Sequence, residues 1–208
     1  MATKDIEKKL KVLQDEIERL KDIEEIKKLQ RIYGYYLEHW ECDNMVDLFS
    51  DSPDTTAEVS DNGLCVGKEE IRKFFSALKD PPPEFLHIMM IVSGVVDLDE
   101  DGKTAKGRWY AFGCLALPMQ KGETRPFFAH GVYENEYVKE HGKWKIKKLH
   151  FNRTFLSPYE DGWVKTPVVS DNYAHKGKGI SFKPPTSYKP YPSGYIVPYH
   201  YKNPASGR

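Results

Sequence analysis

Apolar residues near the start of the chain repeat with the spacing of an α-helix. The first stripe steps by 4, 3, 4 and 3 positions through Ile6, Leu10, Leu13, Ile17 and Leu20. This spacing is typical of a coiled-coil seam of nearly three heptads. Beyond Leu20 the apolar steps shorten to three, so the stripe moves around the helix. The pattern predicts one or two helices over 4–49, in two parts with different partners. The first part, about 4–22, packs on another subunit, and the second, about 23–40, packs on the protein's own core.

The next segment predicts a short hairpin and a short helix. Residues 55–67 contain alternating apolar positions around Asn62–Gly63, a dipeptide that favours a tight turn. Residues 68–79 carry apolar side chains at helical spacing and precede the triplet Pro81–Pro83, which ends a helix.

From residue 84 onward the period becomes that of β-strands. Long runs rich in aromatic and β-branched residues are separated by turns that contain glycine, and they span 85–99, 104–118, 125–140 and 143–156. A bend is expected in the first run at Ser93–Gly94, and the last three form an antiparallel meander. Helices followed by strands predict an α+β fold, with the helices on one face of a curved sheet.

The last 52 residues, 157–208, differ in composition and show no period. They hold 8 of the 14 prolines and 7 of the 13 tyrosines. So many aromatic residues are unusual in a disordered segment. We interpret 157–208 as an extended arm laid over a surface of its own or a neighbouring subunit; a floppy tail is the alternative.

Composition excludes several classes of function. Lys+Arg and Asp+Glu are both 31, so the formal net charge is +0 and no basic surplus for nucleic acid exists. No apolar run is long enough to cross a membrane, and the N-terminus has no apolar signal core. The three cysteines lack metal-ligand spacing and indicate reduced thiols in a cytoplasm. Motifs for nucleotide, flavin or nicotinamide cofactors and for metals do not occur, so we expect no cofactor.

Several segments, in order and spacing, resemble the SnoaL-like branch of the nuclear transport factor 2-like superfamily over about residues 23–156. The matching features are a tyrosine-bearing helix, an acidic helix end before Leu48–Phe49, a Gly-Lys-Glu-x-Ile helix start at Gly67, a histidine opening the first long strand, and a Gly-Lys-Trp-Lys-Ile strand at 142–146. The resemblance implies a cone: a strongly bent sheet around helices, with a pocket at its open end. Residues 1–22 and 157–208 then form an N-terminal helical extension and a C-terminal arm outside the 23–156 domain.

The resemblance also implies a repertoire of reactions. Scytalone dehydratase, bile-acid dehydratases and hexachlorocyclohexane dehydrochlorinase share this cone and perform eliminations without a cofactor, using a histidine base. Diarylpropane-lyase relatives, polyketide cyclases, ketosteroid isomerase and non-catalytic binding modules also use it. Fold alone therefore does not choose among them.

The residue matches imply a catalytic group. His87 corresponds to the histidine base, because it opens the same strand among apolar neighbours. Glu38 matches the carboxylate that orients this base, although the dehydratases have an aspartate there; Asp43 is the fallback. Tyr33, five residues before Glu38, matches a pocket tyrosine that acts as general acid, whereas Tyr36 could equally be core.

A second group of residues is expected to bind substrate. Arg108 and Arg153 lie within otherwise apolar strands, and a buried arginine needs either a carboxylate, such as Glu134 or Glu136, or a substrate oxyanion. The substrate-binding candidates are Tyr36, Arg108, Trp109, His130, Tyr133, Phe151 and Arg153. Core packing is the alternative for each of the aromatic ones.

The sequence thus predicts a cofactor-independent lyase that acts on a hydrophobic, aromatic or polycyclic oxygenated molecule, by dehydration or retro-aldol cleavage. An isomerase, a polyketide cyclase and a non-catalytic binding module stay open. We expect a homotrimer, with a dimer as the next choice, because the N-terminal seam and the tyrosine-rich arm both need a covering surface.

Overall fold

A computed structural model describes residues 2–77, 81–119, 123–170 and 179–208. The helical elements are α1 (Ala2–Glu38), α2 (Cys42–Asp47), the 3₁₀ turn η1 (Ser60–Asn62), α3 (Lys68–Ser76) and α4 (Gly162–Lys165). The strands are β1 (Thr56–Val59), β2 (Leu64–Val66), β3 (Leu86–Leu98), β4 (Thr104–Pro118), β5 (Thr124–Glu140) and β6 (Lys143–Pro158). The predicted end of the third helix, at 78–79, lies outside the described residues.

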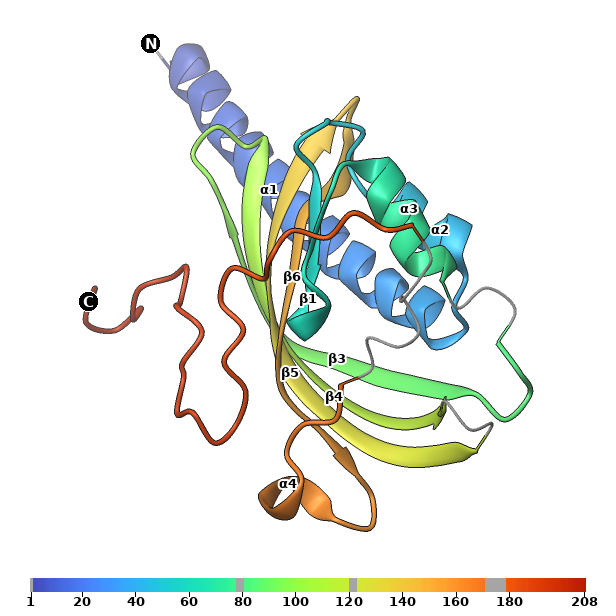
Figure 1. Cartoon of the computed structure of the whole chain (residues 1–208). Coiled ribbons are helices and arrows are strands. Elements are labelled where there is room, and N and C mark those ends of the chain that lie inside the picture. Colours follow the sequence, from blue (N-terminus) through green and yellow to red (C-terminus); the bar gives the residue numbers. More distant parts are fainter. Residues whose placement is uncertain (1, 78–80, 120–122, 171–178) are drawn as a thin grey trace.

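All six strands form one sheet in the order β2-β1-β6-β5-β4-β3. The long strands β3 to β6 pair antiparallel in sequence order, whereas β1 returns parallel to β6. Figure 1 shows that this sheet is strongly bent and that α1, α2 and α3 lie together on one of its sides. The predicted α+β cone is therefore confirmed.

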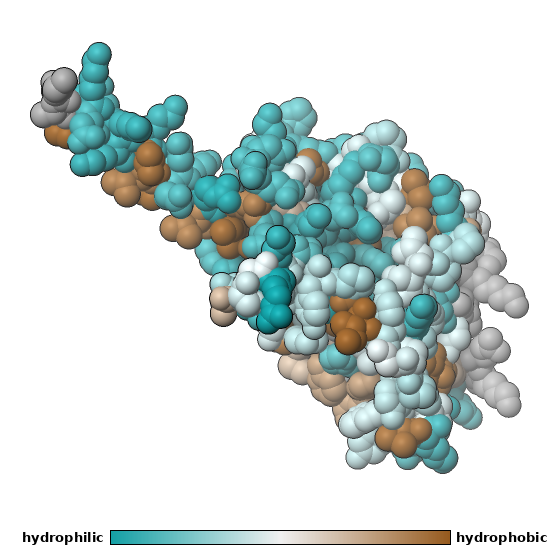
Figure 2. Space-filling view, turned by 90° about the vertical axis from the view of Figure 1, so that its left-hand side faces the viewer, coloured by the Kyte–Doolittle hydropathy of each residue, from teal (hydrophilic) through white to brown (hydrophobic). Residues whose placement is uncertain are grey.

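The first two predicted helical parts are one continuous helix. α1 runs unbroken for 37 residues, and the change of stripe marks a change of surroundings rather than a break. Ile26, Tyr33 and Leu37 are buried against the sheet. Residues before Asp22 stand out from the body, with apolar side chains along them (Figures 1 and 2).

The predicted bend in β3 is present. Its pairing with β4 shifts register between Val92 and Val95, and Ser93 between them has a positive φ of 56°. A Cβ on Gly94 would lie 1.9 Å from the Trp109 ring. Glycine is therefore required here, because the large indole packs directly against the backbone.

Residues 179–208 of the C-terminal arm start beside α3, where the Ser181 N–H donates to Glu70 at 2.7 Å, and then cross to the side of the sheet away from α1 (Figure 1). Lys183 exchanges both backbone hydrogen bonds with Leu64 of β2. Glu58 of β1, which is 1% exposed, accepts hydrogen bonds from the backbone N–H and hydroxyl of Thr186 at 2.6 and 2.7 Å. The arm thus bonds to its own chain, which is one of the two surfaces that the sequence left open for it.

Candidate functional site

A pocket lies between α1, α3 and the side of the sheet that the helices cover. Its volume is about 820 Å³, the open mouth included. Most of its wall is apolar, which suits a ligand with a hydrophobic body. The polar side chains on its wall are those of Tyr33, Trp40, Asn62, His87, Tyr133 and Arg153.

His87 lies at the start of β3 and forms part of this wall. Its imidazole stacks on Phe85, with ring centroids 5.9 Å apart, and meets the edge of Trp40 at 5.2 Å. Two aromatic rings thereby restrict its orientation. Because strand residues alternate between faces, His87 and Met89 share the pocket side of β3.

Tyr33 and Tyr133 form a pair of buried phenols. Their rings meet edge to face with centroids 6.1 Å apart, and their side chains are hydrogen-bonded. Burial raises the pKa of Tyr33 well above its ordinary value, and the neighbouring Tyr133 raises it further. Burial also raises the pKa of Tyr133, although the Tyr33 hydrogen bond and the charge of Arg153 oppose this rise. Both phenols are therefore neutral at physiological pH and able to donate a proton or a hydrogen bond.

Arg153 of β6 is 5% exposed, and its Nη2 lies 3.9 Å from Oδ1 of Asp61 in η1. Phe151, two residues earlier on the same face, packs against Tyr133 with centroids 4.6 Å apart. A cation at the wall of an apolar pocket can stabilise negative charge that develops on a bound molecule. Of the substrate-binding candidates, Tyr133, Phe151 and Arg153 line the pocket.

Asn62 is a pocket residue that sequence reasoning missed. Its side chain is 9% exposed, and its Oδ1 has no hydrogen-bond partner among the described residues. We interpreted Asn62–Gly63 only as turn residues, and Gly63 does end η1 with a positive φ of 105°. No sequence signal distinguishes a turn asparagine from one that also presents its amide to a ligand.

Glu38, the expected partner of His87, does not line this pocket. It belongs instead to a separate groove with Arg31, Gly34 and Tyr35 of α1, along β3. The reason is helical geometry: Leu37, four residues after Tyr33, shares the pocket face, and the fifth residue is turned away. Asp43, the fallback, is exposed and pairs with Arg72 at 2.7 Å. Among the described lining residues there is no carboxylate.

Tyr36, Trp109 and His130 also lie away from the pocket wall. Tyr36 is half-buried and packs on the core. Trp109 is 3% exposed and donates to the Tyr137 hydroxyl at 3.0 Å, which makes it a core residue. His130 sits over Phe155, at 5.7 Å between centroids, and burial lowers its pKa. Its neighbour Ala129 takes the pocket-facing position of β5, so strand alternation turns His130 to the other face.

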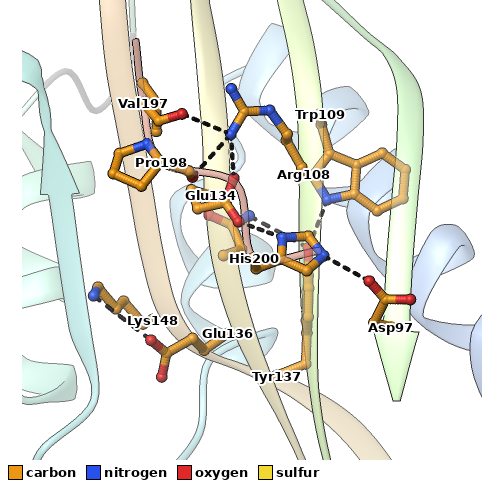
Figure 3. A network of polar contacts seen from close by, with 11 residues as sticks. Asp97, Arg108, Trp109, Glu134, Glu136, Tyr137, Lys148, Val197, Pro198 and His200 are labelled. Atoms are coloured by element: carbon orange, nitrogen blue, oxygen red, sulfur yellow. Dashed lines mark hydrogen bonds and ion pairs between the residues drawn. The ribbon is translucent and has the colours of Figure 1, made fainter. Parts of the chain in front are cut away.

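Arg108 binds a structural carboxylate and the arm rather than the pocket (Figure 3). It donates to Glu134 at 2.8 Å and to the carbonyls of Val197 and Pro198 at 3.2 and 3.1 Å. His200 of the arm reaches the same Glu134 through Nδ1, and its Nε2 lies 3.3 Å from Asp97. Of the two alternatives left open for Arg108, the carboxylate Glu134 is the one observed.

The described residues contain no group of three or more His, Cys, Asp or Glu side chains placed to hold a metal ion. Within those residues, no helix is both long and apolar enough to span a membrane.

The bent sheet, the helices on its inner side and the pocket between them define a cone-shaped α+β protein. The SnoaL-like domain matches residues 18–150, more than half of the 208-residue chain. The protein therefore belongs to the SnoaL-like domain family, as the resemblance predicted.

Solved structures with the same fold are distant in sequence. A candidate scytalone dehydratase from Novosphingobium aromaticivorans is 18% identical with a TM-score of 0.59, covering 68% of this chain and 90% of that chain. Hexachlorocyclohexane dehydrochlorinase LinA-type3 from Novosphingobium barchaimii is 17% identical with a TM-score of 0.58, covering 69% and 93%. A candidate aromatic ring hydroxylase from Novosphingobium aromaticivorans is 24% identical with a TM-score of 0.56, covering 68% and 96%. At these identities the similarities establish the fold.

Proposed function

We propose that this protein is a cofactor-independent lyase that eliminates water from a hydrophobic, aromatic or polycyclic oxygenated molecule. The observation that carries the proposal is the pocket wall itself. It combines one imidazole, His87, with a buried cation, Arg153, and neutral phenols in an otherwise apolar cavity. These are the parts that proton abstraction next to a carbonyl requires.

In the proposed reaction, the neutral imidazole of His87 takes a proton from the carbon next to a substrate carbonyl. The electron pair of that C–H bond moves to the carbonyl oxygen and forms an enolate. Arg153 and the Tyr133 phenol stabilise this oxyanion. When the carbonyl re-forms, the enolate electrons create a C=C bond and expel hydroxide from the next carbon. The proton on His87 converts this hydroxide to water, so atoms and charge balance.

Two other functions use the same parts. Retro-aldol cleavage would begin with removal of a hydroxyl proton by His87 and would break a C–C bond, and an isomerase or cyclase would return the proton elsewhere. A non-catalytic binding module is the competing class, and one observation favours it. No carboxylate from the described residues lines the pocket to orient the imidazole.

The test measures proton abstraction independently of which bond breaks. The protein is incubated in D₂O with a panel of aromatic ketones that carry a β-hydroxyl group, and deuterium uptake and loss of water are followed by mass spectrometry. We expect both with the wild type and neither with His87→Ala, whose melting temperature should remain close to that of the wild type. His130→Ala is the matched control, because His130 lies on the other face of the sheet. Tight binding of panel members without exchange or elimination would favour the binding module.

A further inference from the structure

The segment of α1 that precedes Asp22 carries an apolar stripe that nothing in the described chain covers. We name this stripe the N-terminal seam. Its members are Ile6, Leu10, Leu13, Ile17 and Leu20, exposed by 64, 54, 60, 51 and 62%. Figure 2 shows the segment standing clear of the body, with apolar side chains along its length.

The body contacts α1 near the end of this segment, first through Lys139, whose Nζ lies 3.5 Å from Oε1 of Glu18. Asp22 is 5% exposed and accepts hydrogen bonds from Lys139 Nζ at 2.7 Å and Trp144 Nε1 at 2.9 Å. From Ile26 onward the helix packs apolar side chains into the core, among them Tyr33 and Leu37. The seam therefore contributes nothing to the core of its own chain, and an isolated helix exposing five large aliphatic side chains indicates an interaction surface.

We propose that the N-terminal seam forms a parallel coiled coil with the same segment of another copy of this chain. Its steps of 4, 3, 4 and 3 place Leu10 and Ile17 at one core position of the heptad, and Ile6, Leu13 and Leu20 at the other. The stripe thus faces one direction along the whole segment. This proposal is independent of the lyase assignment, because it concerns a surface remote from the pocket.

The parallel direction follows from which seam residues face each other at each level, or layer, of the coiled coil. In a parallel pair each of the five seam residues meets its own counterpart, so every layer is apolar. In the antiparallel register that pairs Leu10 with Leu13, Leu20 would lie opposite Thr3 and one layer would be lost.

Charges beside the seam fit the same direction. In this heptad Glu16 occupies the position just before a core residue, and Lys21 the position just after one. These flanking positions meet between parallel helices, so Glu16 of each copy faces Lys21 of the other. Both side chains are exposed in the single chain, and a pair of opposite charges at this contact favours the parallel register.

The first experiment measures the mass of the full-length protein by light scattering and sedimentation at micromolar concentration. We expect a multiple of the 24.1 kDa chain mass. Leu13→Lys should raise the dissociation constant at least tenfold, because each copy loses one buried leucine and places a charge in an apolar contact. Val12→Lys is the matched control: Val12 is 53% exposed on the same helix but lies off the seam.

A charge reversal tests the direction. Glu16→Lys should weaken association by placing two lysines together, and adding Lys21→Glu should restore it. A wild-type chain that sediments at 24.1 kDa would overturn the proposal. So would a Leu13→Lys variant that associates as the wild type does, or a Val12→Lys variant that is equally disruptive. Failure of Lys21→Glu to restore association would overturn the parallel register. The circular dichroism of each variant should match the wild type, because these side chains are exposed.

Discussion

At the scale of single residues, two side chains that the sequence assigned to one catalytic site, Tyr33 and Glu38, lie in different places. Tyr33 and Glu38 lie five positions apart on one helix, yet only Tyr33 lines the pocket. We therefore expect Glu38→Gln to change turnover by less than about threefold, since a carboxylate that orients a catalytic base would cost orders of magnitude. Steady-state kinetics on a substrate from the panel check this. A loss of a hundredfold would show that Glu38 acts on His87 after all.

The unpartnered amide oxygen of Asn62 has a different consequence. Because a buried acceptor without a partner is costly, we expect Asn62 to receive a hydrogen bond from a hydroxyl of the ligand. Asn62→Ala should weaken ligand binding about three- to tenfold, the worth of one ordinary hydrogen bond. Isothermal titration calorimetry with the reaction product measures the dissociation constants of the wild type and the variant.

Thr55→Val is the matched control for Asn62→Ala. Thr55 is fully buried, and its hydroxyl also has no partner among the described residues, but it does not line the pocket. If the valine variant weakens binding as much as Asn62→Ala does, the effect reflects general loosening of the fold rather than a contact with the ligand.

At the scale of elements, the bend of β3 depends on a missing side chain. Gly94→Ala would place a Cβ 1.9 Å from the Trp109 ring. The indole would have to move, and with it the hydrogen bonds that run from Trp109 through Tyr137 to Gln30 of α1. We expect a loss of about 2–3 kcal/mol of unfolding free energy, measured by chemical denaturation.

Gly102→Ala provides the comparison for this substitution. A Cβ at Gly102 meets nothing within 4 Å, although its φ is +64°, so only backbone strain of about 1 kcal/mol is expected. If the two variants were equally stable, the close approach of Trp109 to the β3 backbone would not matter for folding.

Periodicity predicted the long strands and the short helix because each buries one face along its length. It could not decide between one helix and two over the N-terminal region, where α1 is continuous. The stripe moves after Leu20 because its neighbours change, from open surroundings to the sheet, and a change of neighbours looks the same in sequence as a break. The prediction that Glu38 faces the pocket was wrong by one position for a related reason. The family match identifies the helix, but whether Leu37 or Glu38 points into the pocket depends on how the helix is rotated about its axis.

At the scale of the whole molecule, acid should release the arm. Burial by itself would raise the pKa of Glu58, but hydrogen bonds from His150 and Thr186 outweigh burial and lower it to about 2. A depressed carboxyl pKa stabilises the fold above the pKa of the unfolded chain. That contribution is lost as pH falls from about 4.5 toward 2. At neutral pH, up to about 3 kcal/mol of the free energy of unfolding depends on the contacts of the Glu58 carboxylate.

Glu58→Gln should therefore lower stability at pH 7 and flatten its dependence on pH in the acidic range, as followed by urea denaturation at several pH values. Glu136→Gln is the control, because Glu136 is a half-exposed strand residue that pairs with Lys148 at 3.6 Å. A wild-type curve with no acidic slope beyond that of Glu58→Gln would mean that the arm is held by other contacts.

The unbroken course of α1 has a mechanical consequence. Its 37 residues span about 55 Å at 1.5 Å per residue, and Asp22 is clamped by Lys139 and Trp144 between the two ends. Because Ile26 and Tyr33 are buried in the core, the second half of this rod is fixed in the body and the projecting half has a fixed direction. In the proposed coiled coil, the rod would therefore set the distance and orientation between the bodies of the two copies. Lys21→Gly, just before Asp22, would loosen that spacing and leave Tyr33 and the pocket wall in place.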